Sequence, residues 1–238
     1  MRRLLLLIIA CAAALAAGQK IVGGPFVVDV TASTATVVWV VESDQATLRA
    51  PAGAAPRVSP SLQVEKTTLA GLQPNTRYEY DVGGADAVKG SFKTPPNGAA
   101  PFQFVVFGDT RTRHDVHRRV IEAILKHGVP DFVVHTGDLV ANGDETSLWP
   151  VFFDIEKDLL RQAAFFPALG NHERNSRDFY DFFQVATPYY SFNWGNAHFI
   201  VLNSDIGNVA KSKFVRDAYW AEQTRWLEED LAGSQNAD

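Results

Sequence analysis

The stretch that decides the fold is FQFVVFGD, which runs from Phe102 to Asp109. Its first six residues are almost continuously apolar, which is typical of a strand buried on both faces of a sheet. Two later stretches repeat the pattern, DFVVHTGD from 131 to 138 and FFPALGNHE from 165 to 173. Each apolar run leads to a glycine that is followed directly by a polar residue. Helical patterns separate the runs, so this region predicts an α/β layered domain with a largely parallel sheet.

Apolar residues that recur at intervals of three and four predict the helices of this region. The predicted helices cover residues 115–127, 148–160, 177–183 and 218–231. Two more strands are expected at 189–194 and 198–202, joined by a Gly-Asn turn. The residues expected in the core of the strands are Phe104, Val106, Val133, Val134 and Ala168.

Residues 21–96 have a different character, with short β-branched and aromatic runs separated by turns. The strands expected here are 36–41, 46–49, 62–68, 78–82 and 91–94. Trp39 and the sequence GLQPNTRYEY from Gly71 to Tyr80 resemble the buried tryptophan and tyrosine corner of a fibronectin type III-like sandwich. More narrowly, the segment resembles the N-terminal domain of purple acid phosphatases. The proline-rich segment 95–101 is the expected linker to a second domain at 101–238.

The first 20 residues read as a leader. Two arginines precede an uncharged run from Leu4 to Ala17, which is shorter than the roughly 20 apolar residues of a spanning helix. We expect residues 1–18 to be a signal peptide and the protein to be secreted or periplasmic. An uncleaved anchor is the alternative, and the IIAC sequence ending at Cys11 also resembles a lipid-anchor motif, which we rank second. No later segment is apolar enough to cross a membrane, so no span is expected once the leader is removed.

Charge and cysteine content exclude several classes of protein. The formal charge is −5, from 22 basic and 27 acidic residues, and no basic block is present. Nonspecific nucleic-acid binding depends on neutralising phosphates, so it is not expected. Cys11 is the single cysteine, which rules out a disulfide within the chain and a structural zinc site built on thiolates.

Residues that could take part in catalysis follow each of the three apolar strands. Asp109 and Asp138 come directly after glycines, and Gly170 is followed by Asn171 and His172. Ligands in open α/β sheets bind at the carboxyl ends of the strands, so these side chains are expected to meet. Carboxylate and amide oxygens suit metal ions, and histidine suits proton transfer near neutral pH. Two metal ions can offset the charge of a phosphate ester and activate a water for its hydrolysis.

The order GD, GD, GNHE resembles the calcineurin-like metallophosphoesterase superfamily, and the preceding sandwich pattern points to its purple acid phosphatase-like branch. The resemblance implies that Asp109 binds one metal ion, Asp138 bridges two and Asn171 binds the second. It implies that His172 is the general acid for the leaving group, that the metals are two ions of Fe, Zn or Mn, and that the partner is a small or nucleotide phosphate ester. The alternative roles are turns or helix caps for the aspartates and a hydrogen-bonded loop residue for His172.

The sequence departs from the family pattern at two positions. Arg111 stands where the superfamily often has the histidine of a DxH motif, and Ala141 stands where purple acid phosphatases have the tyrosine that binds ferric iron. A purple iron–tyrosinate site is therefore not expected. Arg111 is a candidate phosphate contact, because a guanidinium binds oxyanions in a bidentate way, or else a surface ion-pairing residue. His117 is a further candidate ligand, or else a packing histidine of the helix.

The later VxxH and GHxH motifs of the family, which supply three histidine ligands, have no counterpart among the six histidines. The phosphoesterase domain is therefore expected to be incomplete at its C-terminus. We expect weak metal binding and little turnover from residues 17–238 alone, because metals such as zinc and iron use imidazole as well as carboxylate. The leading function is acid phosphatase-like phosphomonoester hydrolysis. A phosphodiesterase or nucleotidase of the same superfamily and a non-catalytic exported binding protein are the alternatives.

Overall fold

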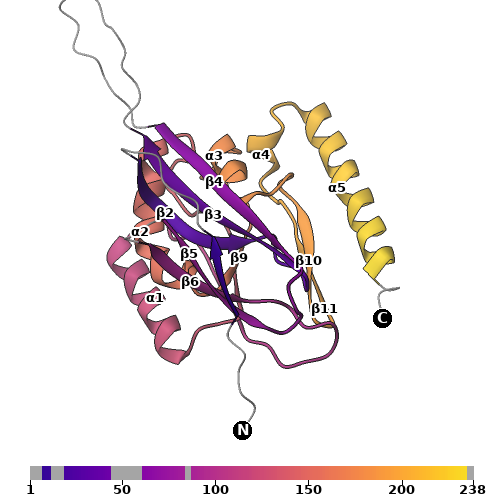
Figure 1. The fold of residues 1–238 in the computed structure, drawn as a ribbon. Helices are drawn as coiled ribbons and strands as arrows, with labels where there is room; N and C mark the ends of the chain where they lie inside the picture. Colours follow the sequence, from indigo (N-terminus) through magenta and orange to yellow (C-terminus); the bar gives the residue numbers. More distant parts are fainter. Residues whose placement is uncertain (1–6, 12–18, 44–60, 84–86, 235–238) are drawn as a thin grey trace, which may run out of the picture.

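The computed structural model describes residues 7–11, 19–43, 61–83 and 87–234. Its centre is a six-stranded mixed sheet in the order β4-β3-β2-β9-β8-β7 (Figure 1). The strands are β4 (Ser61–Ala70), β3 (Thr34–Ser43), β2 (Gln19–Val28), β9 (Ala164–Pro167), β8 (Phe132–His135) and β7 (Phe104–Phe107). Strands β2, β3 and β4 are antiparallel, whereas β7, β8 and β9 are parallel. The predicted parallel sheet therefore forms one half of a larger mixed sheet.

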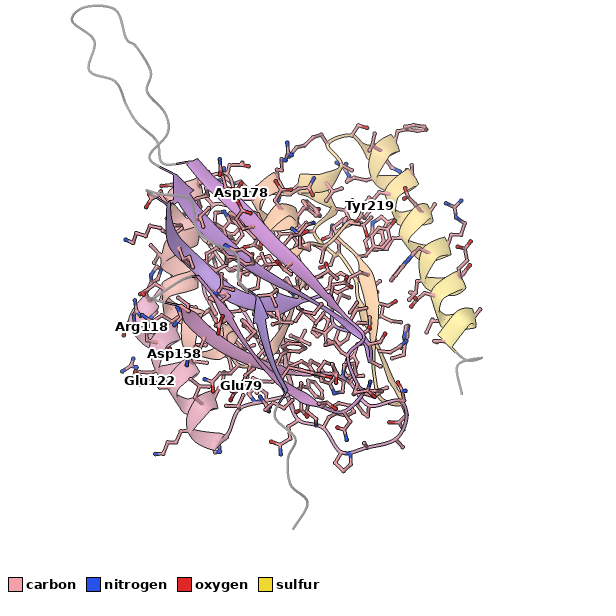
Figure 2. The ribbon with its side chains drawn as sticks, viewed as in Figure 1. Glu79, Arg118, Glu122, Asp158, Asp178 and Tyr219 are labelled. Carbon is pink, nitrogen blue, oxygen red and sulfur yellow. The ribbon has the colours of Figure 1, made fainter. Side chains whose placement is uncertain are left out.

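Helices cover one face of this sheet. They are α1 (His114–His127), α2 (Trp149–Leu160), which follows the 3-10 turn η1 (Thr146–Leu148), and α3 (Arg177–Phe183). Their apolar residues pack against alternate residues of β2 and β3, among them Phe26 and Val38. Trp149, Phe153 and Phe183 are buried at the centre of this layer. The charged side chains on the other side of α1 and α2 lie at the surface, as Arg118, Glu122 and Asp158 do in Figure 2.

Two small sheets cover the opposite face. One has the order β1-β5-β6, and the other is the hairpin β10-β11. Their strands are β1 (Leu7–Cys11), β5 (Arg77–Val82), β6 (Val88–Lys93), β10 (Tyr190–Trp194) and β11 (Ala197–Val201). Trp39 is buried between the layers, as predicted, and the hydroxyl of Tyr78 accepts the backbone N–H of Gln73 at 2.7 Å. That bond is the defining contact of a tyrosine corner.

The expected sandwich over residues 21–96 is not confirmed as a unit with its own sheets. Strand β2 pairs with β9 in parallel through Val27 and Ala164, which joins the two halves of the chain into one sheet. The core between the sheet and the helices likewise combines Phe26 with Phe153 and Phe183, whose rings are in contact. The segment is therefore integrated with the α/β region through shared packing.

Two residues expected in the core are exposed, and that expectation was wrong. Phe104 is 42% and Val106 is 53% accessible, whereas Val133 is buried as predicted. The reason is that β7 is an outer strand of the six-stranded sheet, and the helices cover only one of its faces. A continuous apolar run predicts burial on both faces only for a strand that has neighbours and layers on both sides.

The C-terminal segment differs from the prediction in its extent. Helix α4 (Ile206–Val209) was not expected, and α5 (Lys213–Ser234) is longer than the predicted helix 218–231. Helix α5 runs along the side of the molecule away from α1 (Figure 1). It docks through Tyr219, which points inward in Figure 2 and accepts a hydrogen bond from the Asn203 amide, and through the buried Gln223.

Two further sequence predictions concern other parts of the chain. The strand expected at 46–49 lies outside the described residues. Within the predicted leader, Leu7–Cys11 forms β1, which is parallel to β5. None of the helices in the described part of the chain is long and apolar enough to span a bilayer.

Candidate functional site

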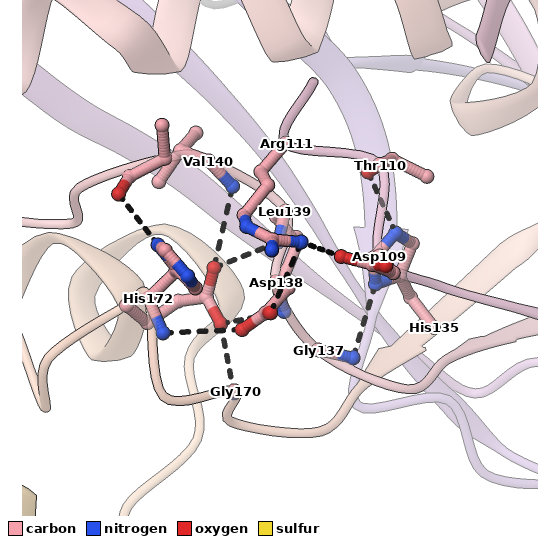
Figure 3. A network of polar contacts seen from close by, with 12 residues as sticks. Asp109, Thr110, Arg111, His135, Gly137, Asp138, Leu139, Val140, Gly170 and His172 are labelled. Atoms are coloured by element: carbon pink, nitrogen blue, oxygen red, sulfur yellow. Dashed lines mark hydrogen bonds and ion pairs between the residues drawn. The ribbon is translucent and has the colours of Figure 1, made fainter. Parts of the chain in front are cut away.

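The loops that follow β7 and β8 are joined by backbone hydrogen bonds, so the first two motifs lie side by side (Figure 3). The N–H of Asp109 donates to the carbonyl of Gly137 at 3.0 Å. The N–H groups of Thr110 and Arg111 both donate to the carbonyl of Asp138, each at 3.0 Å. The parallel order of the two strands brings their carboxyl ends to the same edge, as expected from the sequence.

The carboxylates of Asp109 and Asp138 converge on one cationic group. Nη1 of Arg111 contacts Oδ1 of Asp109 and lies 3.5 Å from Oδ2 of Asp138. The other carboxylate oxygen of Asp138, Oδ1, accepts the backbone N–H of His172 at 3.1 Å. The Asp138 side chain is 17% accessible and that of Asp109 is 72% accessible, so the pair opens to solvent on the Asp109 side.

The backbone of this site is held in unusual conformations. Asp109 and Asp138 have φ values of 57° and 59°, in the left-handed region. Non-glycine residues in that region cost energy and collect at functional sites. A Cβ on Gly170 would overlap the backbone and carboxylate of Asp138, so only glycine lets the third loop approach the second this closely.

Glu173 is the residue that ties the second and third loops together. Its buried carboxylate accepts the backbone N–H groups of Asp138, Leu139, Val140 and Gly170, at 2.7 to 3.3 Å. Burial raises the pKa of Glu173, and these N–H bonds oppose that shift. Glu173 follows His172 in the GNHE sequence, and nothing in that local pattern shows that a glutamate after a glycine loop is buried or has this role.

His172 is oriented by a backbone carbonyl. Its Nδ1 lies 2.8 Å from the carbonyl oxygen of Ala141, which can only accept, so Nδ1 carries the proton in this arrangement. The tautomer that results leaves Nε2 as the nitrogen able to exchange a proton with a bound molecule. The side chain is partly accessible, which suits a residue that meets a ligand.

Asn171 lies between Gly170 and His172 in the third loop. It is exposed, and its carbonyl accepts the side-chain N–H of Asn208 at 3.1 Å. Among the described contacts, its side-chain amide makes none with Asp109 or Asp138. The structure therefore brings Asp109, Arg111, Asp138 and the His172 backbone together and leaves the Asn171 amide outside their network.

His117 is buried and bound to a different partner. Its Nε2 lies 2.5 Å from Oε1 of Glu156, and both side chains are almost inaccessible. Burial raises the pKa of Glu156. Within the described structure, Nδ1 of His117 and Oε2 of Glu156 have no hydrogen-bond partner. His117 and Thr110 line a cavity of about 20 Å³, close to the volume of one water, just behind the Asp109 loop.

His135, the last residue of β8, is a second buried histidine and hydrogen-bonds both loops of the site. Nδ1 of His135 accepts the N–H of Gly137, so its Nε2 carries the proton and donates to Oγ1 of Thr110 at 3.0 Å. Burial, with a smaller contribution from His117, lowers the pKa of His135 to about 3. The imidazole is therefore neutral across the physiological pH range and holds both aspartate loops. The sequence placed His135 at the end of a buried strand, which was the available signal.

The side chains at this site supply some of the ligands that a metal ion requires. Asp109 and Asp138 fit a cation, because their carboxylates already face one in the guanidinium of Arg111. Within the described ranges, no cluster of three or more His, Cys, Asp and Glu side chains is placed to hold a metal. Among the described residues the site thus offers the oxygen donors of Asp109 and Asp138 to a cation, without a third His, Cys, Asp or Glu side chain placed to join them.

Comparisons with known proteins concern the family and the fold of the chain. A family model described as calcineurin-like phosphoesterase matches residues 102–231. Among solved structures, the purple acid phosphatase PPD1 from seeds of yellow lupin (Lupinus luteus) is similar, with a TM-score of 0.59 and 18% sequence identity. The alignment covers 87% of this chain and 48% of the lupin chain, so this chain spans about half of that protein. A search of curated proteins found no match.

Proposed function

Because the chain belongs to the calcineurin-like phosphoesterase family, we propose that it hydrolyses phosphate monoesters at the Asp109–Asp138 site in a metal-dependent reaction. The observation that carries the proposal is the convergence of these two carboxylates on a single cationic group. Two carboxylates on residues of left-handed conformation, at the carboxyl ends of adjacent parallel strands, support the proposal of a cation site here.

In this proposal Asp109 would hold one metal ion, Asp138 would hold both, and the Asn171 amide, which lies outside the carboxylate network in this structure, would turn inward to hold the second. Bound metal ions of Fe, Zn or Mn would neutralise the phosphate and lower the pKa of a water molecule. The N–H of His172 fixes Oδ1 of Asp138, so Oδ2 is directed toward the shared cation position. The chain itself thus sets the orientation of the bridging carboxylate.

His172 is the proposed acid for the leaving group. Its Nδ1–H is committed to the Ala141 carbonyl, so in the doubly protonated imidazolium form the Nε2–H would supply the proton to the departing alkoxide. Arg111 is the proposed contact for the phosphate oxygens, because its planar guanidinium matches their spacing. Both side chains belong to loops that are hydrogen-bonded to Asp138.

The proposal also covers export of the protein, the type of phosphatase reaction, the kind of metal site expected with Ala141 and the division of the chain. The charged and apolar pattern of residues 1–18 supports export through a signal peptide. The neighbour's name, purple acid phosphatase, supports an acid phosphatase-like reaction. Ala141 stands where purple acid phosphatases have the iron-binding tyrosine, so the proposal does not include a purple iron–tyrosinate site. The division into 21–96 and 101–238 stays in the proposal as two sequence segments, which β2 and β9 join into one sheet.

The test compares wild type with Asp138→Asn in two measurements, Mn²⁺ binding by calorimetry and hydrolysis of p-nitrophenyl phosphate and bis-p-nitrophenyl phosphate. We expect Mn²⁺ binding that Asp138→Asn removes, and slow hydrolysis of the monoester in preference to the diester. Asp158→Asn, an exposed aspartate of α2, is the matched control and leaves both measurements unchanged. Absence of Mn²⁺ binding together with absence of hydrolysis overturns the proposal. Rapid hydrolysis that depends on Asp138 instead overturns the expectation of little turnover from this chain.

A further inference from the structure

We propose that Arg111 is a built-in counter-cation of the carboxylate pair, which a metal ion must displace and which then becomes free to bind phosphate. The inference rests on the proposed function, because it concerns the same metal site. It makes Arg111 a residue that sets metal affinity, in addition to its proposed contact with substrate.

The guanidinium of Arg111 contacts both carboxylates of the site. A single nitrogen, Nη1 of Arg111, serves both Asp109 and Asp138, so the guanidinium stands between the carboxylates where a bridging cation would stand (Figure 3). Two carboxylates this close repel each other unless a positive charge lies between them. Arg111 therefore stabilises the metal-free site and competes for its oxygens.

The backbone of Arg111 is held by a hydrogen bond, whereas its side chain is partly accessible to solvent. The N–H of Arg111 donates to the Asp138 carbonyl, which holds the residue at the site whatever its side chain does. The side chain itself is 26% accessible, and Asp109 beside it is 72% accessible. A displaced guanidinium therefore stays within reach of a ligand at the same edge of the sheet.

The charge of the guanidinium is the third feature that supports the competition. A guanidinium remains protonated at every accessible pH, so it cannot leave the carboxylates by losing its proton. Only a competing cation or a competing anion can separate the ion pairs. A metal ion supplies the cation for Asp109 and Asp138, and the phosphate of a substrate supplies the anion for Arg111. Metal entry and phosphate binding are thereby coupled through one side chain.

The experiment uses the chain stripped with EDTA and compares wild type, Arg111→Gln, Arg111→Lys and the control Arg113→Gln. Arg113 is an arginine two residues away and is exposed. Calorimetry measures Mn²⁺ binding, and then inorganic phosphate binding in saturating Mn²⁺. We expect Arg111→Gln to bind Mn²⁺ roughly tenfold more tightly, as the loss of two ion pairs, one of them to the exposed Asp109, predicts, and phosphate roughly tenfold more weakly.

Arg111→Lys separates charge from shape. Lysine keeps the positive charge and loses the planar fork, so Mn²⁺ affinity stays near wild type while phosphate affinity falls. Arg113→Gln behaves as wild type in both measurements. Changes of opposite sign in Arg111→Gln are the signature of competition, because a disordered site would lose affinity for both ligands.

A measurement on the wild-type chain covers the case in which Arg111→Gln does not fold. The Nε–H signal of Arg111 in a nitrogen-correlated NMR spectrum, assigned by its loss in Arg111→Lys, should shift as Zn²⁺ is added. Equal Mn²⁺ affinity in wild type and Arg111→Gln, or an unmoved signal in the presence of bound Zn²⁺, overturns the competition and leaves the metal site intact. Failure of every variant to bind a metal overturns the proposed metal site and the competition together.

Discussion

The carboxylate of Glu173 accepts the backbone N–H of Asp138 at 2.8 Å, so the GNHE loop holds the residue proposed to bridge the metals. The same carboxylate holds the next two residues of the Asp138 loop and Gly170 of its own loop. A single buried side chain therefore fixes the spacing between two motifs that lie 33 positions apart in the sequence, from Asp138 to Asn171.

Glu173→Gln should loosen the Asp138 loop. An amide presents an NH₂ group to donors that need an acceptor, so at least one N–H is left without a partner in a buried place. We expect a loss of about 2 kcal/mol in the free energy of unfolding, together with weaker Mn²⁺ binding. Urea unfolding and calorimetry measure the two effects. Glu79→Gln, an exposed glutamate of β5, is the control, and equal stability of the two variants would contradict the role of Glu173.

Gly170→Ala should damage the site through steric overlap. The added Cβ would overlap the Asp138 backbone and approach Oε2 of Glu173, so the loops must separate. We expect a loss of roughly 1–3 kcal/mol of stability, in the range of overpacked cores, and loss of Mn²⁺ binding. Gly233→Ala is the comparison, because a Cβ there meets open space near the end of α5 and alanine favours a helix. Similar thermal midpoints for the two variants would argue against close approach of the loops.

His117→Leu should expose the cost of a buried unpaired carboxylate. The substitution leaves Glu156 without its partner, and we expect a loss of about 3–5 kcal/mol at pH 8. Burial raises the pKa of Glu156 above its unfolded value, so its contribution to stability is complete at low pH and is lost as pH rises. The deficit of the variant should therefore be smaller at pH 5 than at pH 8. The double variant His117→Leu, Glu156→Leu should recover most of the loss, and a deficit that does not change with pH or with the second substitution would contradict this pairing.

His135 should make the fold sensitive to acid. Its folded pKa of about 3 lies below the unfolded value of 6.5, so the unfolded chain binds the proton first as pH falls. The contribution of His135 to stability is complete above about pH 6.5 and is lost toward pH 3, by about 1.4 kcal/mol per pH unit. Urea unfolding of wild type and His135→Asn across this range isolates the effect as a difference in slope. Identical slopes would contradict burial of a neutral imidazole, and His127→Asn, at the exposed end of α1, should keep the wild-type slope.

The local elements were largely readable from the chain. The helix at 177–183 was predicted with the bounds that α3 has, and α1 and α2 begin within one residue of their predicted starts, whereas α4 was not predicted and α5 is longer than predicted. The tyrosine corner was also predicted, and the bond between Tyr78 and Gln73 is present. These features depend on residues a few positions apart, so hydrophobic periodicity and turn residues carry enough information to predict them.

The contacts between distant residues were not readable in this way. Nothing in the local pattern showed that Val27 pairs with Ala164, that β7 lies at the edge of the sheet, or that Glu173 is buried. Burial and strand pairing are properties of the assembled layers, because they depend on which surfaces come together over long stretches of chain. Phe104 illustrates this, since its apolar surroundings in the sequence predicted a core residue that the sheet leaves exposed.

By itself, the sequence determined which residue types stand at the ends of three strands, and so the class of chemistry that Asp109, Asp138 and His172 can support. Only the tertiary structure decided how these residues are arranged, with Arg111 between the two carboxylates and Glu173 beneath them. The physical reason is that a side chain's chemistry is fixed by its covalent structure, whereas its partner, its pKa and its exposure depend on residues that folding brings to it.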